Sequence, residues 1–312
     1  MKGPLVDVSG AVDLHCHPAP DLFPRLADDI DVAQDAAGRA FRAVMIKCHF
    51  EPTASRAAHV RRMVPGIEVF GGIVLNHAVG GVNPAAVESA LRMGAREVWM
   101  PTVDARYHAE VHGGTGGYDA QQSGGKARPG IAVVAREGEL TPETLEVLDL
   151  VAQHDAILGT CHLSPAEILA LVSEARRRGV QRITVTHPFF KVPNLSLEEL
   201  TQVVALGAYA EFGYCTISPM WGYATPKRVA EAVLAIGAER CLLVSDAGQR
   251  HNPMPAEALR IFAQSLFESG VSEEEISTMI RTNPSELLDL GPAPVIERAV
   301  AGGGMQSEGA PS

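Results

Sequence analysis

Eight short apolar runs recur along the chain, and stretches with a helical period separate them. The runs occupy residues 11–17, 43–50, 68–76, 97–103, 156–163, 182–187, 208–215 and 241–246. Their hydrophobicity is continuous rather than alternating, which is typical of strands covered on both faces of a parallel sheet. Eight strand-then-helix repeats with right-handed crossovers close most naturally into a (β/α)8 TIM barrel, so we predict this α/β fold.

Polar caps mark the starts of the predicted helices, and glycine marks their ends. Ser164 followed by Glu167 is a capping-box pattern, and we expect the same box at Ser196, Ser272 and Asn283. A doubly wound open sheet is the alternative fold. It usually carries a glycine-rich phosphate turn after the first strand, where this chain has HCHPAPD instead.

We expect one barrel over residues 1–290, with an insertion at 113–140 after the fourth strand. Residues 113–130 hold seven glycines and are either a mobile active-site loop or a disordered insertion. Residues 130–140 predict a small hairpin with its turn at Glu137 and Gly138. The tail at 291–312 is rich in Gly, Ala and Pro, which predicts disorder.

The charge balance excludes some classes of partner. Lys and Arg number 26 against 37 Asp and Glu, so the formal net charge is −11. We therefore expect a small-molecule substrate rather than nucleic acid or a membrane surface, and leave a homo-oligomer open. The chain has no signal-peptide pattern and no apolar run of about 18 residues, which predicts a cytoplasmic protein. Five cysteines without a CxxC spacing predict reduced thiols.

Histidines end several of the predicted strands. His15 and His17 end the first run, His162 the fifth and His187 the sixth, and Asp246 ends the eighth. The carboxyl ends of barrel strands form the active-site face, and residues two apart in a strand point the same way. Each histidine alone could be an ordinary structural residue. Together they favour a divalent cation, which would satisfy all of these polar groups at once.

This arrangement resembles the amidohydrolase superfamily, whose barrels bind one or two divalent metals. The resemblance covers about residues 11–290 and rests on DLHCH at 13–17, GTCHLS at 159–164, VTHP at 185–188 and VSDAG at 244–248. The chain also resembles an uncharacterised bacterial branch of that superfamily, through KCHFEPT at 47–53 and LNHAVGGVNP at 75–84. The resemblance implies a metal-dependent TIM barrel with His15, His17, His162, His187 and Asp246 as ligands. It does not imply a substrate.

Strand four departs from the two-metal pattern. Members with two metals usually bridge them with a carboxylated Lys or a Glu from that strand, and residues 99–104 contain neither. One ion is therefore the simplest expectation. Lys47 and His49 share a face at the end of strand two, which is similar to metal barrels of the polymerase-and-histidinol-phosphatase type, so a second ion stays open. Lys47 would be a carboxylated bridge, a partner for an anionic substrate, or a structural residue paired with Glu51.

The expected chemistry is hydrolysis. A cation held by neutral imidazoles lowers the pKa of a coordinated water toward about 7. Imidazole-rich ligation favours zinc, with manganese or iron as alternatives. The resemblance implies that Asp246 contacts the metal and carries the proton from the attacking water to the leaving group.

The leading hypothesis is a metal-dependent hydrolase that cleaves an amide, lactone or related ester bond. The alternatives are a metal-dependent decarboxylase (a lyase) of a small aromatic or unsaturated acid, a phosphoesterase, and a non-enzymatic metal protein.

Hydrogen-bond donors around the predicted barrel mouth favour an anionic substrate. The candidate substrate-binding residues are Arg25, His77, Arg106, Tyr107, His108, Arg250 and His251. Arginines in such loops are also often paired with nearby acids, for which Asp21 and Asp104 are candidates here.

Overall fold

The computed structural model describes residues 5–118, 121–122, 128–135 and 138–291. Eight parallel strands form one sheet in the order β1-β2-β3-β4-β7-β8-β9-β10. They are β1 (Val12–Cys16), β2 (Ala43–Ile46), β3 (Glu68–Val74), β4 (Glu97–Trp99), β7 (Ile157–Gly159), β8 (Arg182–Thr186), β9 (Tyr209–Gly213) and β10 (Cys241–Val244). Each lies within one predicted run, and every run extends beyond its strand at the carboxyl end. Those last residues instead lie at the barrel mouth, in loops or, for Tyr214 and Cys215, in the short helix that follows β9.

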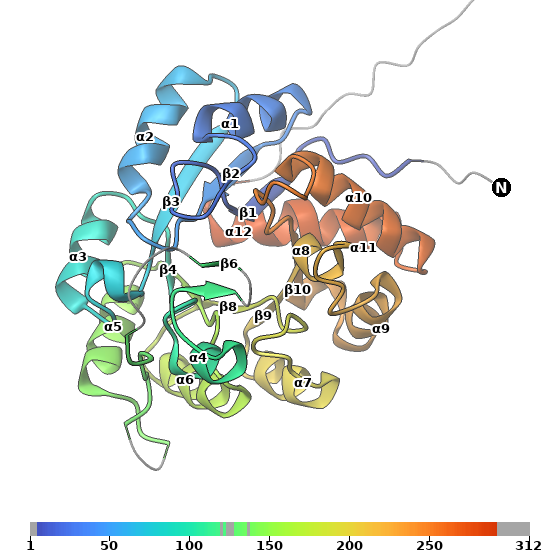
Figure 1. The fold of residues 1–312 in the computed structure, drawn as a ribbon. Helices are drawn as coiled ribbons and strands as arrows, with labels where there is room; N and C mark the ends of the chain where they lie inside the picture. Colours follow the sequence, from blue (N-terminus) through green and yellow to red (C-terminus); the bar gives the residue numbers. More distant parts are fainter. Residues whose placement is uncertain (1–4, 119–120, 123–127, 136–137, 292–312) are drawn as a thin grey trace, which may run out of the picture.

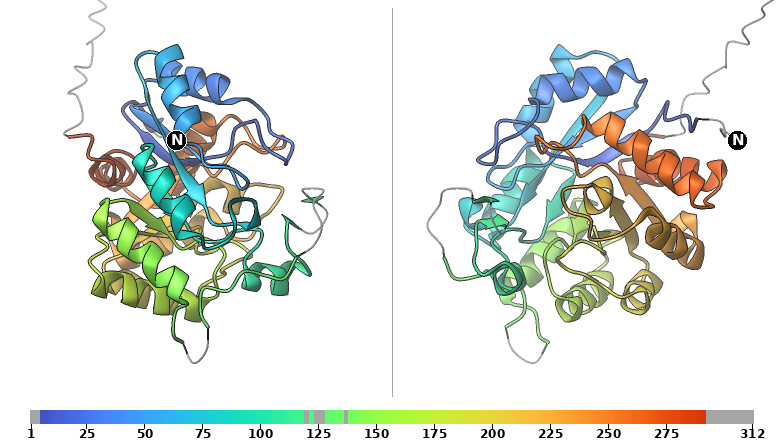
Figure 2. Two further views of the ribbon diagram at one scale, coloured as in Figure 1. Left: turned by 90° about the vertical axis from the view of Figure 1, so that its left-hand side faces the viewer. Right: turned by 45° about the vertical axis from the view of Figure 1, so that its right-hand side comes forward.

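Helices alternate with the strands and surround them, as Figures 1 and 2 show. The α-helices are α1 (Asp29–Gly38), α2 (Ala54–Met63), α3 (Pro84–Arg92), α4 (Arg106–His112), α5 (Pro142–Gln153), α6 (Pro165–Arg177), α7 (Leu197–Ala205), α8 (Tyr214–Ile217), α9 (Pro226–Ile236), α10 (Pro255–Glu268), α11 (Glu273–Ser277) and α12 (Asn283–Leu287). The predicted (β/α)8 barrel is confirmed. No helix in the described part of the chain is long and apolar enough to span a membrane.

Capping boxes form at three of the predicted positions, Ser164, Ser196 and Ser272. The box predicted at Asn283 is wrong. Asn283 continues directly from a π-helical turn at Thr278–Thr282, so no new helix start needs a cap there. Its Nδ2 instead donates 2.8 Å hydrogen bonds to the carbonyls of Ala238 and Cys241. The side chain therefore ties α12 to the start of β10.

Contacts between the first and last strands close the barrel. The backbone N–H of Asp246 donates to the carbonyl of His15, and that of His17 donates to the carbonyl of Ala247, both at 2.8 Å. A bridge pairs Cys16 with Ala247 in parallel. Residues just beyond β10 therefore dock on the carboxyl end of β1.

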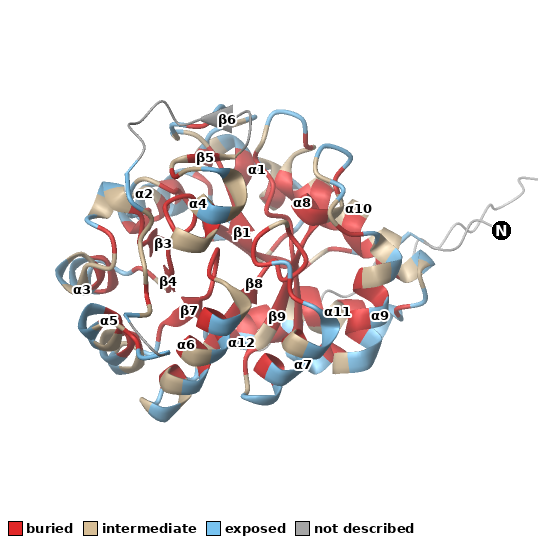
Figure 3. Ribbon diagram, turned by 60° about the horizontal axis from the view of Figure 1, so that its bottom comes forward, coloured by how far each residue is buried: buried red, intermediate tan, exposed pale blue. Residues whose placement is uncertain are grey.

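The core has an outer layer beneath the helices and an inner cluster within the barrel. Figure 3 shows the buried strands at the centre and the exposed residues on the outer helix faces. Trp99 belongs to the inner cluster, where Gly72 and Gly159 leave room for its indole, because a Cβ on either would collide with the ring. Leu287 and Leu288, at the end of α12, also join this cluster. The interior is thus packed rather than open.

The insertion after β4 contributes a second, two-stranded sheet of β5 (Gly117–Tyr118) and β6 (Gln121–Gln122). An antiparallel bridge joins Val134 to Leu140, as the predicted hairpin requires, although Glu137 of its turn lies outside the described residues. The tail at 292–312, for which we expected disorder, also lies outside them.

Candidate metal centre

An irregularity in strand pairing turns the first two histidines into the barrel. The register of β1 against β2 shifts between Asp13 and Cys16. Leu14 belongs to the inner cluster, so strict alternation would send His15 outward. The shift reverses this alternation, and Cys16 joins the outer layer. Oδ1 of Asp13 supports the shifted backbone by accepting hydrogen bonds from the N–H groups of His15 (3.2 Å) and Ser245 (3.0 Å).

His15, His17 and Asp246 meet at the carboxyl end of the barrel. The Nε2 atoms of the two histidines lie 3.1 Å apart. Oδ1 of Asp246 lies 3.3 Å from each of them. All three residues are buried, and among the described residues they form a group whose ligand atoms all lie within 4.8 Å of one another. The convergence predicted for these three residues is present.

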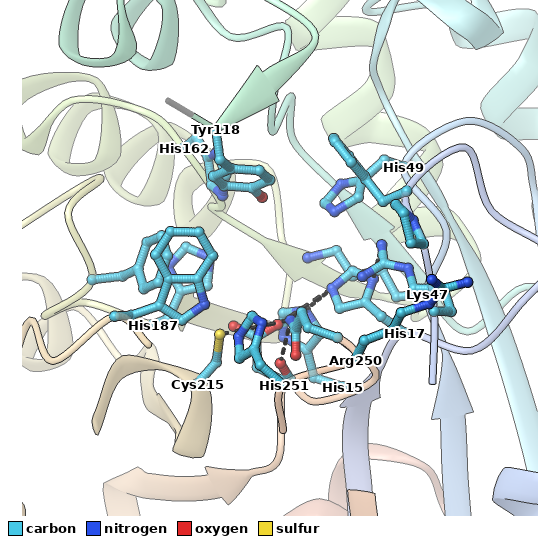
Figure 4. A pocket seen from close by; sticks show the side chains of 17 residues that line it. His15, His17, Lys47, His49, Tyr118, His162, His187, Cys215, Arg250 and His251 are labelled. Carbon is cyan, nitrogen blue, oxygen red and sulfur yellow. Dashed lines mark hydrogen bonds and ion pairs between the residues drawn. The ribbon is translucent and has the colours of Figure 1, made fainter. Parts of the chain in front are cut away.

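His162 and His187 lie beside this group, across the space shown in Figure 4. Their ring centres are 5.1 Å apart, and the ring of His187 is 6.2 Å from that of His15. Nδ1 of His187 is buried and has no hydrogen-bond partner among the described residues. His49 stacks on His17 at 4.7 Å, and its Nδ1 lies 2.8 Å from the Thr102 hydroxyl.

Lys47 is fully buried beside the histidines, with 1% of its surface exposed. Its Nζ lies 3.6 Å from the Cys161 thiol and 5.0 Å from the centre of a Trp99 ring. The pairing with Glu51 considered from the sequence does not form, because Glu51 binds Arg56 at 2.7 Å. No ion pair of Lys47 is found among the described residues. Its charge interacts with the buried carboxylates of Glu97, Glu211 and Asp246, and it opposes the rise that burial causes in the pKa of each.

Burial sets the protonation of the centre. It lowers the pKa of His15 to about 3, with the charge of Lys47 as the next largest cause. Burial likewise lowers the pKa of four further imidazoles, those of His17, His49, His162 and His187. The pKa of Asp246 is raised, mainly by burial. The histidines are therefore neutral at pH 7, which is the form that coordinates a metal.

Three residues at the strand ends adopt left-handed backbone conformations. Cys161, His187 and Asp246 have φ angles of 51°, 32° and 46°. Such angles cost roughly 1–3 kcal/mol each outside glycine, and they concentrate at functional sites where the surroundings hold them. Three of the seven described non-glycine residues with positive φ are thus two candidate ligands and the thiol that contacts Lys47.

Two residues that orient candidate ligands were not assigned that role from the sequence. Oε1 of Glu211, in β9, lies 2.9 Å from Nδ1 of His15. Nδ1 of His108 lies 2.8 Å from Nδ1 of His162, and Nε2 of His108 lies 2.7 Å from the carbonyl of Gly117. A carboxylate in the middle of an apolar strand was a usable signal for Glu211. His108 was expected to contact substrate, whereas it lies behind His162.

Strand β4 does carry a glutamate, which the expectation based on residues 99–104 left out. Glu97 is fully buried, and the Thr184 hydroxyl donates to its Oε1 at 3.4 Å. It lies two residues before Trp99 and is not in the group formed by His15, His17 and Asp246. Burial raises its pKa well above the ordinary value. Glu97 therefore belongs to the barrel interior rather than to the mouth.

A cavity of about 430 Å³ opens over the centre, which is within the usual range for small-molecule sites. Ten of the predicted site residues line it: His15, His17, Arg25, Lys47, His49, His162, His187, Asp246, Arg250 and His251. Arg25 is held by Asp21, with Nη2 to Oδ2 at 2.7 Å, so the alternative of a paired arginine applies to it. Arg250 and His251 are exposed at the rim.

Four predicted substrate-binding residues are not among those that line the cavity: His77, Arg106, Tyr107 and His108. Arg106 pairs with Glu167 at 2.7 Å, and Nε2 of His77 lies 2.9 Å from the carbonyl of Pro129. As predicted, they follow strands β3 and β4, although Arg106, Tyr107 and His108 lie in α4. Arg106 and His77 thus bind groups outside the cavity lining, and His108 lies behind His162.

Comparison with protein families identifies a relationship over most of the chain. Residues 10–211 match the model of DUF6282, which is described as a family of unknown function. The chain belongs to DUF6282. No curated protein sequence matches it.

Solved structures share the fold of this DUF6282 member. The phosphotriesterase homology protein from Escherichia coli, complexed with phosphate in its active site, is 18% identical with a TM-score of 0.53, covering 90% of this chain and 99% of its own. An amidohydrolase from Pseudomonas aeruginosa is 14% identical with a TM-score of 0.56, covering 90% and 95%. A putative 2-pyrone-4,6-dicarboxylic acid hydrolase from Pseudomonas putida is 14% identical with a TM-score of 0.57, covering 91% and 98%. The fold that the amidohydrolase resemblance implied is therefore confirmed.

Proposed function

We propose that this DUF6282 member is a metal-dependent hydrolase of the amidohydrolase type, which cleaves an amide, lactone or related ester bond in a small anionic substrate. The observation that carries the proposal is the meeting of His15, His17 and Asp246 within 4.8 Å at the base of a cavity. The similarity in fold to structures named as hydrolases supports it.

The donor set fits a divalent cation. Three buried ligand atoms face one point, and the buried Nδ1 of His187 lacks a partner among the described side chains. His15, His17 and Asp246 would hold one ion, with His162 and His187 completing its shell or holding a second. When bound, the cation supplies a positive charge that polarises the scissile bond and lowers the pKa of a coordinated water. The number of imidazoles favours zinc over manganese or iron, and one ion over two because no bridge comes from β4 at the mouth.

The protein's own residues would then orient and move protons. Glu211 holds Nδ1 of His15, so that Nε2 of the ring faces the centre. Asp246 lies 3.3 Å from both histidines and lines the cavity with them, so its carboxylate can take a proton from the attacking water and deliver it to the leaving group. Lys47 would either receive an anionic group of the substrate or, as a carboxylated side chain with His49, complete a second site.

A metal-dependent decarboxylase is the second candidate. The observation that favours it is the position of Glu97 beneath Trp99, which leaves β4 without a bridging ligand at the mouth. A one-ion centre with these ligands suits carbon–carbon cleavage of a small unsaturated acid as well as hydrolysis.

We also propose a cytoplasmic location. The five cysteines are buried and form no disulfide, which is typical of proteins in a reducing compartment.

The test replaces Asp246 by alanine and screens both variant and parent against ester, lactone, amide and phosphoester substrates, with release of carbon dioxide measured separately. Asp149→Ala is the matched control, because Asp149 is exposed and pairs with Arg178 on the outer surface. We expect Asp246→Ala to lose turnover while thermal unfolding stays cooperative. Turnover that survives in Asp246→Ala, or carefully purified protein that binds no divalent metal, would contradict the proposal.

A further inference from the structure

Aromatic side chains gather at the mouth of the cavity, in a chain where Phe, Trp and Tyr make up 5% of the residues. Four of them line it, Phe23, Tyr118, Phe190 and Trp221, and we call these four the aromatic collar. They follow four different barrel strands: β1, β4, β8 and β9. The ring of Tyr118 lies 5.8 Å from Phe23, 6.4 Å from Phe190 and 5.9 Å from Trp221. The insertion therefore supplies the ring that joins the two sides of the collar.

A second row of rings supports the collar from behind. The ring of Phe50 lies 5.5 Å from that of Phe23, and the ring of Tyr223 lies 4.8 Å from that of Phe190. Tyr223 also stacks on Trp221 at 6.0 Å. Rings held by other rings lose little freedom when a ligand binds, so the collar is preorganised.

Charged groups lie above and below the collar. The His15–His17–Asp246 group is at the base, and Arg250 is exposed at the rim. In the part of the chain that the structure describes, no ion pair is found for Arg250, whereas Arg25 is bound to Asp21. Figure 4 shows Tyr118 and Arg250 on opposite sides of the open space. The rim thus offers a guanidinium to an anion, while the walls beneath it are aromatic.

We infer that the cavity takes a small, planar, unsaturated ring that carries a carboxylate. The collar stacks on the ring, Arg250 binds the carboxylate, and the bond to be cleaved faces the histidines and Asp246. Aromatic faces interact with a planar π-system more strongly than buried area alone provides. A puckered ring with the same number of carbons buries similar area but cannot stack. This inference deepens the proposed function and rests on it, because it treats the cavity as the substrate site.

The experiment measures binding by titration calorimetry rather than turnover. The full chain, supplied with zinc, is titrated with benzoate, cyclohexanecarboxylate and benzamide. Benzoate and cyclohexanecarboxylate offer the same carboxylate to Arg250, so their ratio of affinities isolates the planar ring. We expect benzoate to bind about three- to tenfold more tightly than cyclohexanecarboxylate, and benzamide to bind more weakly than benzoate.

Variants locate the effect. Tyr118→Leu and Trp221→Leu each reduce the preference for benzoate to less than about twofold, because each removes one aromatic ring of the collar. Tyr209→Leu is the matched control, since Tyr209 begins β9 at the opposite end of the barrel, and it leaves the preference unchanged. Arg250→Gln weakens both carboxylates by the same factor. Thermal unfolding of every variant verifies that the barrel is intact.

The inference would be overturned by equal affinities for the two carboxylates or by no binding of either. It would also be overturned by a preference for benzoate that survives in both Tyr118→Leu and Trp221→Leu. These outcomes leave the proposed hydrolase standing if substrates are still turned over. Selective binding of benzoate without any turnover would instead support binding by the aromatic collar and contradict the proposed function.

Discussion

Replacing His108 by leucine should weaken metal binding, although His108 does not line the cavity. The carbonyl of Gly117 can only accept, so Nε2 of His108 carries the hydrogen of their 2.7 Å hydrogen bond. Nδ1 of His108 is then an acceptor, and His162 donates to it from its own Nδ1 at 2.8 Å. This arrangement leaves the lone pair on Nε2 of His162, the atom that is free to bind a cation.

The expected magnitude follows from what leucine removes. Loss of a residue that orients a metal ligand typically reduces metal affinity by about 10- to 100-fold, or about 1.4–2.7 kcal/mol. His108 is fully buried, so water does not replace it easily. Asparagine is the matched variant, because it has nearly the shape of leucine and places Oδ1 where Nδ1 of histidine was. His108→Asn should therefore recover most of the affinity.

The assay titrates metal-free protein with zinc against a chromogenic chelator, and ¹H–¹⁵N spectra of the histidines in the metal-free protein report which ring nitrogen of His162 carries the proton. We expect Nδ1 to carry it in the parent and in His108→Asn, and the tautomers to mix in His108→Leu. Equal zinc affinities for parent and His108→Leu would refute the reasoning. Equal losses in both variants would show that the ring of His108 acts by packing alone.

Three further outcomes are expected. Gly159→Ala should cost about 1–3 kcal/mol of unfolding free energy in denaturant titrations, because its methyl group collides with Trp99; unchanged stability would mean that the indole moves freely. Hydrogen bonds from Arg182 lower the pKa of Asp289 in the folded protein. Ionised Asp289 therefore stabilises the fold above the pKa of an unfolded Asp, and this stabilisation is lost as the pH falls through the pKa of Asp289 in the folded protein. Asp289→Asn should thus be less stable at pH 7 by at most about 1 kcal/mol, because Asp289 is largely exposed, and a difference that persists at about pH 2 would contradict this. Removing metal with a chelator should lower the unfolding temperature and zinc should restore it, so an unchanged temperature would indicate that the site holds no ion.

The fold could be predicted because its signals are local. Continuous apolar runs mark the strands, and a serine followed by glutamate three residues later marks helix starts such as those at Ser164 and Ser196. That His15, His17 and Asp246 lie near one another could also be predicted, since the strand ends meet at one face of the barrel. Asn283 matched the same local pattern, yet its side chain bonds to backbone that lies 42 and 45 residues away. A capping pattern does not show whether a preceding helical turn has already made the cap unnecessary.

The inner environment of the centre could not be predicted, because it depends on distant partners. The direction of His15 rests on Asp13, whose second partner, Ser245, is 232 residues away. Glu211 is 196 residues from the histidine that it orients. Tyr118 lies in a glycine-rich stretch that resembles a disordered insertion as closely as a functional loop. Neither periodicity nor spacing carries information about such pairs.

The closure of the barrel and the candidate metal centre are formed by the same residues. The backbone of His15 and Asp246 joins the first strand to the residues after the last, while their side chains face one cation site. A chain emerging from the ribosome therefore has neither a closed sheet nor a complete set of ligands until nearly all of the barrel has been synthesised. Metal capture would follow completion of the fold instead of nucleating it. Once bound, the ion would hold β1 against the residues that follow β10. It would therefore slow unfolding of the barrel more than it speeds folding.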